Sequence, residues 1–206
     1  EKSSLSINRD KILATISSID VYTLSKILSN VKILPVEVRE FISKAKPLGD
    51  LRDLVLEVDS SDPGAGLKWS TKVDFENLKI ESHNQSPAFT NATGMFKATS
   101  KGGSLILDST DFSLWFPKIY ENPLHYEFVQ AKTNIRWDSD FLYFNSGSFI
   151  AVGDEGLGSG IFELRVPDRK DQMGIELNLQ VGMNNPNLDY LEKYLPIKLH
   201  PAAKSW

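Results

Sequence analysis

Residues 129–152 read VQAKTNIRWDSDFLYFNSGSFIAV, and apolar and polar side chains alternate along this stretch. Such alternation is typical of β-strands that have one apolar and one polar face. The residues Asp-Ser-Asp at 138–140 are turn formers, so we predict two antiparallel strands joined by a tight turn. The expected inner face of this hairpin consists of Val129, Ala131, Thr133, Ile135, Trp137, Leu142, Phe144, Ser146, Ser148, Ile150 and Val152.

The same period of two extends outward over residues 51–184 and predicts eight or nine strands in an antiparallel meander. The segment Lys101-Gly102-Gly103 is expected to form one of the hairpin turns. The alternation slips by one residue at 76–77, which indicates a bulge or a corner, and slips again between Leu107 and Phe112. Arg136, Asn178 and Gln180 fall on the polar face of the sheet.

Two helical regions flank the predicted sheet. Residues 1–19 are expected to form an N-terminal strand, and residues 20–50 a helical hairpin that Asp20 caps and Pro35 divides. Residues 185–206 are expected to hold a short helix that begins after Asn187 and ends before Pro196. The four predicted regions are therefore 1–19, 20–50, the sheet at 51–184, and 185–206.

Composition excludes several classes of function. The chain has 206 residues, with 23 Lys and Arg against 27 Asp and Glu, and a net charge of −4 disfavours a nucleic-acid partner. It contains no cysteine, which excludes disulfides, thiol catalysis and cysteine metal sites and suits an oxidising compartment. No window approaches the ~20 apolar residues of a membrane span. The first residue is Glu rather than Met, so we expect a piece of a longer protein.

No group of residues predicts catalysis. His83, His125 and His200 lie in separate segments without the spacing of a metal site. The glycine-rich segment 153–160 precedes a predicted strand rather than a helix, so a hairpin turn is favoured over a phosphate loop. The carboxylates at 138 and 140, like Asp154 and Glu155, stand where turns favour acidic residues. We therefore predict no catalytic residue, no metal and no cofactor.

The apolar face of the sheet is the feature that a function has to use. Alternation alone favours a closed sandwich or barrel, in which this face is the core, over an open curved sheet that leaves an apolar groove. The short terminal helices are too small to cover such a face, however. The candidate groove residues are Trp69, Val73, Phe96, Leu105, Leu107, Ile135, Trp137, Leu142, Phe144, Ile150, Leu164, Leu177 and Leu179.

A family resemblance favours the open form. The segments 48–54 (LGDLRDL), 94–96 (GMF), 101–109 (KGGSLILDS) and 194–197 (YLPI) resemble, in the same order, the YhdP family of large AsmA-like proteins of the Gram-negative envelope. The resemblance extends from about residue 12 to residue 206. Lys101, before the two glycines, and the polar segment 198–200 depart from the family pattern.

The resemblance implies a specific function. AsmA-like proteins have an N-terminal helix anchored in the inner membrane, cross the periplasm as repeated β-groove modules, and are implicated in phospholipid movement to the outer membrane. We therefore expect an α+β, mostly β fold: a curved antiparallel meander that forms an open apolar groove, flanked by short helices. The expected partners are phospholipid acyl chains, neighbouring modules of the same chain and, through other parts of the protein, the inner and outer membranes.

Two alternatives come from other classes. The first is a structural or interaction domain of the envelope, in which the sheet closes on its own core and the edge strands bind another protein. The second is a carbohydrate-binding sandwich that presents Trp115 and Tyr143 as sugar platforms. An open groove predicts binding of an apolar dye, and a closed core predicts none.

Overall fold

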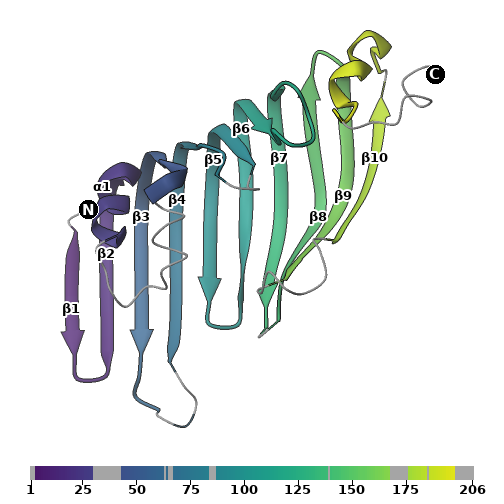
Figure 1. The fold of residues 1–206 in the computed structure, drawn as a ribbon. Helices are drawn as coiled ribbons and strands as arrows, with labels where there is room; N and C mark the ends of the chain where they lie inside the picture. Colours follow the sequence, from purple (N-terminus) through teal and green to yellow (C-terminus); the bar gives the residue numbers. More distant parts are fainter. Residues whose placement is uncertain are drawn as a thin grey trace.

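The computed structural model contains a single sheet of ten antiparallel strands, in which each strand pairs with the next one in the chain (Figure 1). The structure describes residues 3–29, 43–62, 64, 67–83, 87–138, 140–167, 176–184 and 186–197. The elements are β1 (Ser4–Asn8), β2 (Lys11–Asp20), α1 (Val21–Ser29), β3 (Leu48–Asp59), β4 (Lys68–Ile80), β5 (Ala88–Thr99), β6 (Gly102–Trp115), β7 (Leu124–Trp137), β8 (Phe141–Gly153), β9 (Gly156–Pro167), β10 (Glu176–Asn184) and the 3-10 helix η1 (Leu188–Tyr194).

The predicted curved antiparallel meander is confirmed, and the eight strands β3–β10 agree with the eight or nine expected from residue 51 to residue 184. The difference lies near the N-terminus, where the sequence predicted one strand and the structure has the hairpin β1–β2. Its turn lies at Arg9 and Asp10, because Asn8 pairs with Lys11. The sheet therefore includes residues 4–20 and starts its third strand at Leu48, inside the region expected to be helical.

The curvature of the sheet comes from bulges at aspartate and asparagine residues. Asp53, Asn77, Asn91 and Asp111 lie in four successive strands and have φ values of 48°, 50°, 56° and 55°. Asp and Asn tolerate this left-handed conformation better than other residues with a side chain, and an extra residue bends the strand that carries it. Hydrogen bonds tie neighbouring bulges together, since the side-chain nitrogen of Asn91 donates to the carbonyl oxygen of Asp111 at 2.8 Å.

Replacing Asn77 with valine should destabilise the fold by about 1–2 kcal/mol, because a β-branched residue is strained at a φ of 50°. Urea unfolding of the purified chain measures this loss. The matched control is Asn77→Gly, which suits positive φ and should cost less than the valine variant. Equal losses in both variants would mean that the side chain of Asn77, and not its backbone conformation, supports the bend.

Large and small side chains alternate along one row of residues that crosses the sheet. One row of paired residues crosses β4 to β10 and consists of Phe75, Gly94, Leu107, Ala131, Phe149, Gly160 and Val181. A Cβ atom on Gly94 would lie 2.9 Å from the ring of Phe75, and one on Gly160 would lie 3.0 Å from the ring of Phe149. Each ring therefore lies against the neighbouring glycine and takes the space that a larger side chain would need.

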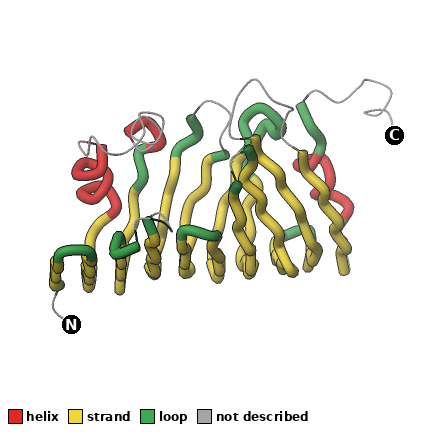
Figure 2. The backbone as a smooth tube through the Cα atoms, turned by 90° about the horizontal axis from the view of Figure 1, so that it is seen from below, coloured by secondary structure: helices red, strands yellow, loops and turns green. Residues whose placement is uncertain are grey.

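The helical segments lie at one end of the strands (Figure 1), and both helices lie on one side of the sheet (Figure 2). The predicted cap of α1 is confirmed, because the Thr23 N–H donates to Asp20 Oδ1 at 2.7 Å. Of the second predicted helix, residues 43–45 are helical and residues 35–42 lie outside the described part. The C-terminal helix begins after Asn187, whose Oδ1 accepts from the Asp189 N–H at 3.1 Å, and it is a 3-10 helix.

Candidate functional site: the apolar concave face

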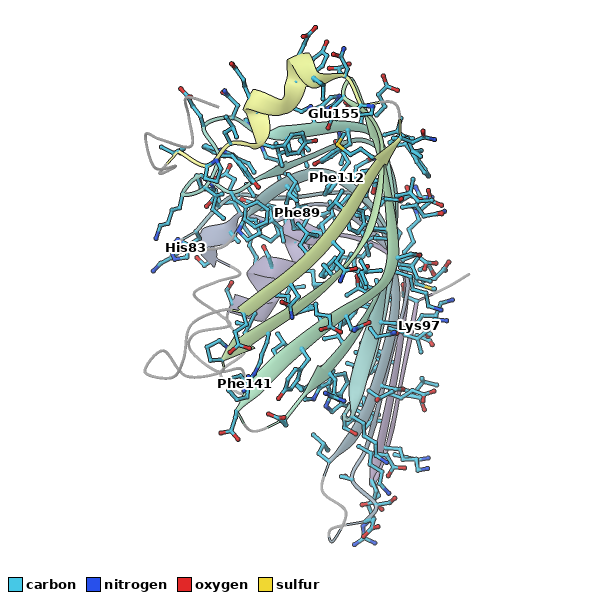
Figure 3. The ribbon with its side chains drawn as sticks, turned by 90° about the vertical axis from the view of Figure 1, so that its right-hand side faces the viewer. His83, Phe89, Lys97, Phe112, Phe141 and Glu155 are labelled. Carbon is cyan, nitrogen blue, oxygen red and sulfur yellow. The ribbon has the colours of Figure 1, made fainter. Side chains whose placement is uncertain are left out.

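The two faces of the sheet differ in chemistry. Side chains that pair directly across neighbouring strands share a face, so the register assigns each residue to one side. Phe89, Phe112 and Glu155 lie on the concave side and Lys97 on the convex side (Figure 3). We define the concave face as the side of the sheet that carries Phe112 and the row from Phe75 to Val181.

Eleven of the thirteen predicted groove residues belong to this concave face. The register places them side by side on neighbouring strands, for example Val73 beside Phe96 and Phe96 beside Leu105. These residues are Trp69, Val73, Phe96, Leu105, Leu107, Ile135, Trp137, Leu142, Phe144, Leu164 and Leu179. The backbone of Leu177 pairs with Leu164, and its side chain lies outside the described part of the chain.

The prediction for Ile150 is wrong. The register of β8 against its neighbour β9 slips between Asn145 and Phe149, and beyond the slip Phe149 continues the row of Leu107 and Ala131. Ile150 pairs with Gln130 on one side and Ser159 on the other, so it lies on the convex face. Sequence reasoning missed Phe149 for the same reason. Gly147 is the available signal, because an isolated glycine within a strand often marks a bulge.

Much of the concave face is open to solvent at the two ends of the sheet. Ile7 in β1 is 68% exposed, and Leu179 and Val181 in β10 are 56% and 52% exposed. The accessible surface of the chain is 14021 Å². A compact protein of 23.1 kDa would expose about 9,700 Å². The excess is what an extended, single-layer sheet with uncovered apolar residues should show.

In the middle of the concave face, apolar side chains pack against one another and are buried. Phe75, Ala92, Phe112 and Val129 form a buried cluster. Nearer the other end of the strands, the indole rings of Trp69 and Trp137 stack with their centroids 6.0 Å apart and an angle of 6° between their planes. The concave face is therefore buried at its centre and exposed at the two ends of the sheet.

A buried carboxylate attaches η1 to the turn between β8 and β9. Glu155 is 2% exposed, and its Oε2 lies 2.5 Å from Lys193 Nζ. The hydroxyl of Tyr194 donates to Glu155 Oε1, and the N–H of Asn187 donates to the Glu155 carbonyl oxygen at 2.9 Å. Burial acts to raise the pKa of Glu155, but the hydrogen bonds from Lys193 and Tyr194 outweigh burial, and the pKa is lowered overall.

Replacing Glu155 with glutamine should loosen η1 by about 2 kcal/mol, because hydrogen bonds to a charged group are lost. At neutral pH, amide exchange in residues 188–195 should rise roughly thirtyfold. In the wild type the lowered pKa means that the carboxylate stabilises η1 above the ordinary glutamate range, and this contribution disappears as pH falls through the folded-state pKa.

The control for this prediction is Asp154→Asn at the same turn, since Asp154 is exposed and should leave the exchange unchanged. Unchanged exchange in the Glu155 variant would show that the backbone contact at Asn187 alone holds η1 in place.

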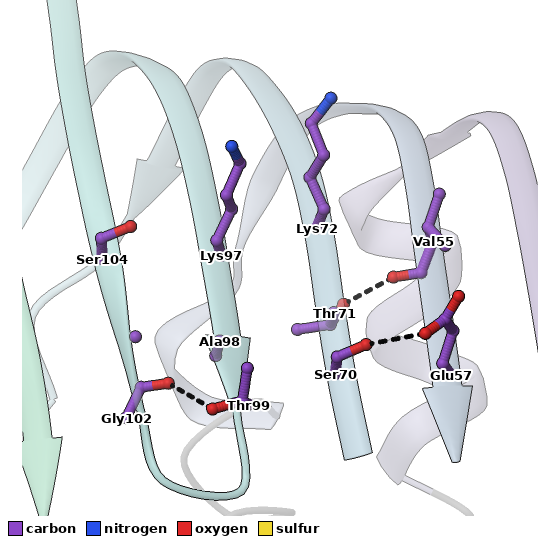
Figure 4. A pocket seen from close by; sticks show the side chains of 11 residues that line it. Val55, Glu57, Ser70, Thr71, Lys72, Lys97, Ala98, Thr99, Gly102 and Ser104 are labelled. Carbon is purple, nitrogen blue, oxygen red and sulfur yellow. Dashed lines mark hydrogen bonds between the residues drawn. The ribbon is translucent and has the colours of Figure 1, made fainter. Parts of the chain in front are cut away.

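The convex face is polar and carries hydrogen bonds between strands. A hollow over β3 to β6 is lined by Glu57, Ser70, Lys72, Lys97 and other polar-face residues (Figure 4). Ser70 Oγ donates to Glu57 Oε2 at 3.2 Å, and farther along the sheet Asn145 Nδ2 donates to Glu163 Oε1 at 3.0 Å. Val55 and Ala98 lie beside these charged and hydroxyl side chains, so the lining of the hollow is mixed in polarity.

Of the acidic residues singled out in the sequence, Asp138 acts in a turn, whereas the side chain of Glu155 binds η1. Asp138 Oδ1 accepts from the backbone N–H groups of Asp140 and Phe141, and these hydrogen bonds lower the pKa of Asp138. Within the described residues, no three His, Cys, Asp or Glu side chains gather in a way that could hold a metal. His200 lies outside that part of the chain. None of the described helices is long and apolar enough to cross a membrane.

A single curved sheet with an apolar concave face and a polar convex face defines a β-groove protein, in which no second sheet covers the apolar side of the described residues. The family model described as YhdP protein matches residues 1–206. The chain therefore belongs to the YhdP family of AsmA-like proteins of the Gram-negative envelope. Neither a curated protein nor a solved structure matches it.

Proposed function

We propose that this chain is one module of a bridge-like protein that carries phospholipids between the inner and outer membranes. The concave face shields the acyl chains, and the headgroups stay in water. The proposed site comprises the eleven concave residues given above together with Phe149 and, as a prediction from its backbone position, Leu177. The protein acts in the periplasm and is anchored in the inner membrane by a part outside residues 1–206.

The observation that carries the proposal is the continuity of the concave face. Apolar side chains extend along it from Ile7 in β1 to Val181 in β10, and those at both ends are exposed. Moving an acyl chain into water costs about 0.8 kcal/mol per CH₂ group, so a continuous apolar path removes tens of kcal/mol for one lipid. Uncovered apolar surface of this extent is characteristic of a binding surface.

Photo-crosslinking in cells tests the proposal on two adjacent residues. A benzophenone amino acid at Phe149 should form adducts with phospholipid, and the same amino acid at Ile150 should form none, because the two side chains lie on opposite faces. Leu107 and Ile106 form a second pair of the same kind on β6.

Adducts at neither position, or equal adducts at both, would contradict the conduit. In that case the alternative is the structural or interaction domain, whose open edge strands β1 and β10 would bind another envelope protein. No catalytic role is proposed for any residue.

A further inference from the structure

The stacked tryptophans come from strands that are not neighbours. Trp69 is the second residue of β4 and Trp137 is the last residue of β7, with β5 and β6 between them. Neighbouring strands lie about 4.8 Å apart, so the two backbones are separated by roughly 14 Å. Ring centroids only 6.0 Å apart mean that both indoles lean inward over the hairpin of β5 and β6.

Two small residues of the same face, Ala98 and Gly103, lie one row away from the tryptophans. Ala98 in β5 pairs with Gly103 in β6, and Ala98 is buried. A Cβ atom on Gly103 would lie 2.6 Å from the carbonyl oxygen of Lys97, so this position requires glycine. No large side chain rises from the sheet at Ala98 and Gly103, and the two indole rings provide the apolar surface beside them.

We propose that Trp69 and Trp137 form a clamp that holds a single acyl chain between their parallel rings. This inference rests on the proposed function and assigns it a specific contact. Carbon atoms in contact lie about 3.5–4.0 Å apart, so one polymethylene chain fits between parallel rings whose planes are roughly 7–8 Å apart. Planes of rings whose centroids are 6.0 Å apart lie no farther apart than this, so the rings have to move apart to admit one chain, and two chains side by side would need a wider opening.

The position of the clamp suits such an opening. Both tryptophans lie at the ends of their strands, and both are partly exposed and outside the buried cluster around Phe112. The nearly parallel planes also present two flat apolar surfaces toward the space between them.

Spectroscopy of the 206-residue chain tests the clamp. The chain has four tryptophans, so Trp115→Phe and Trp206→Phe leave only the stacked pair. Stacked indoles give a coupled circular-dichroism signal, and saturating stearate should reduce this signal by at least half. In the same protein, 9,10-dibromostearate should quench the tryptophan fluorescence, because bromine quenches on contact.

Titration calorimetry with stearate separates the clamp from the conduit. Binding with an unchanged circular-dichroism signal would overturn the clamp and leave the proposed function intact. No binding of stearate would contradict both.

In a separate comparison against the wild type, Trp137→Phe should weaken stearate binding roughly fivefold. Trp115→Phe is the matched control and should not weaken it, since Trp115 does not belong to the stack and its Nε1 donates to the Tyr120 carbonyl oxygen. If Trp137→Phe fails to fold, the circular-dichroism and fluorescence signals of the protein with Trp115→Phe and Trp206→Phe still decide whether the clamp exists.

Discussion

Cells whose only copy of the protein carries Leu179→Asp should lose phospholipid transfer to the outer membrane. Leu179 lies on the concave face of β10 and pairs with Phe162, so the new carboxylate would stand in the path of the acyl chains. A charged side chain costs about 3 kcal/mol in a hydrocarbon environment, which corresponds to a roughly hundredfold slower passage. The measurement is the rate at which labelled phospholipid reaches the outer membrane.

The matched control is Ile161→Asp on the neighbouring strand. Ile161 is also apolar and exposed, at 43%, but it pairs with Gln180 on the convex face. Neither substitution removes a buried side chain, so both variants should fold, and circular dichroism checks this. If both variants transferred lipid at the wild-type rate, or both lost transfer equally, the concave face would not be the path.

The second large effect concerns stability. Phe112→Ala should lower the free energy of unfolding by about 3–5 kcal/mol, because Phe112 is 7% exposed and belongs to the buried cluster with Phe75 and Val129. With a typical dependence on urea, the unfolding midpoint should fall by roughly 1.5 M.

Ile150→Ala is the control for the stability prediction. Ile150 is apolar but lies on the convex face, and its truncation should cost clearly less than that of Phe112. A loss below about 1 kcal/mol for Phe112→Ala would mean that the strand ladder, and not the central cluster, carries the stability of the sheet.

The bulges explain where sequence reasoning succeeded and where it failed. The predicted slip at 76–77 is confirmed by Asn77 at positive φ, and the slip before Phe112 is confirmed by Asp111. Both slips were visible because large apolar residues change parity on either side of them. The slip near Gly147 was hidden, because Ser146, Ser148 and Ile150 keep an unbroken alternation. Only the pairing with β7 and β9 shows that Phe149, and not Ile150, continues the concave face.

The sequence by itself determined the antiparallel meander, the polar and apolar faces of most strands, and the caps at Asp20 and Asn187. These features depend on local alternation, turn residues and capping side chains, which neighbouring residues in the chain specify. Tertiary structure decided whether the sheet closes, which residues beyond β8's bulge face inward, and that Trp69 meets Trp137. These features depend on the twist and bend accumulated over ten strands and on contacts between residues far apart in the chain, which no local pattern encodes.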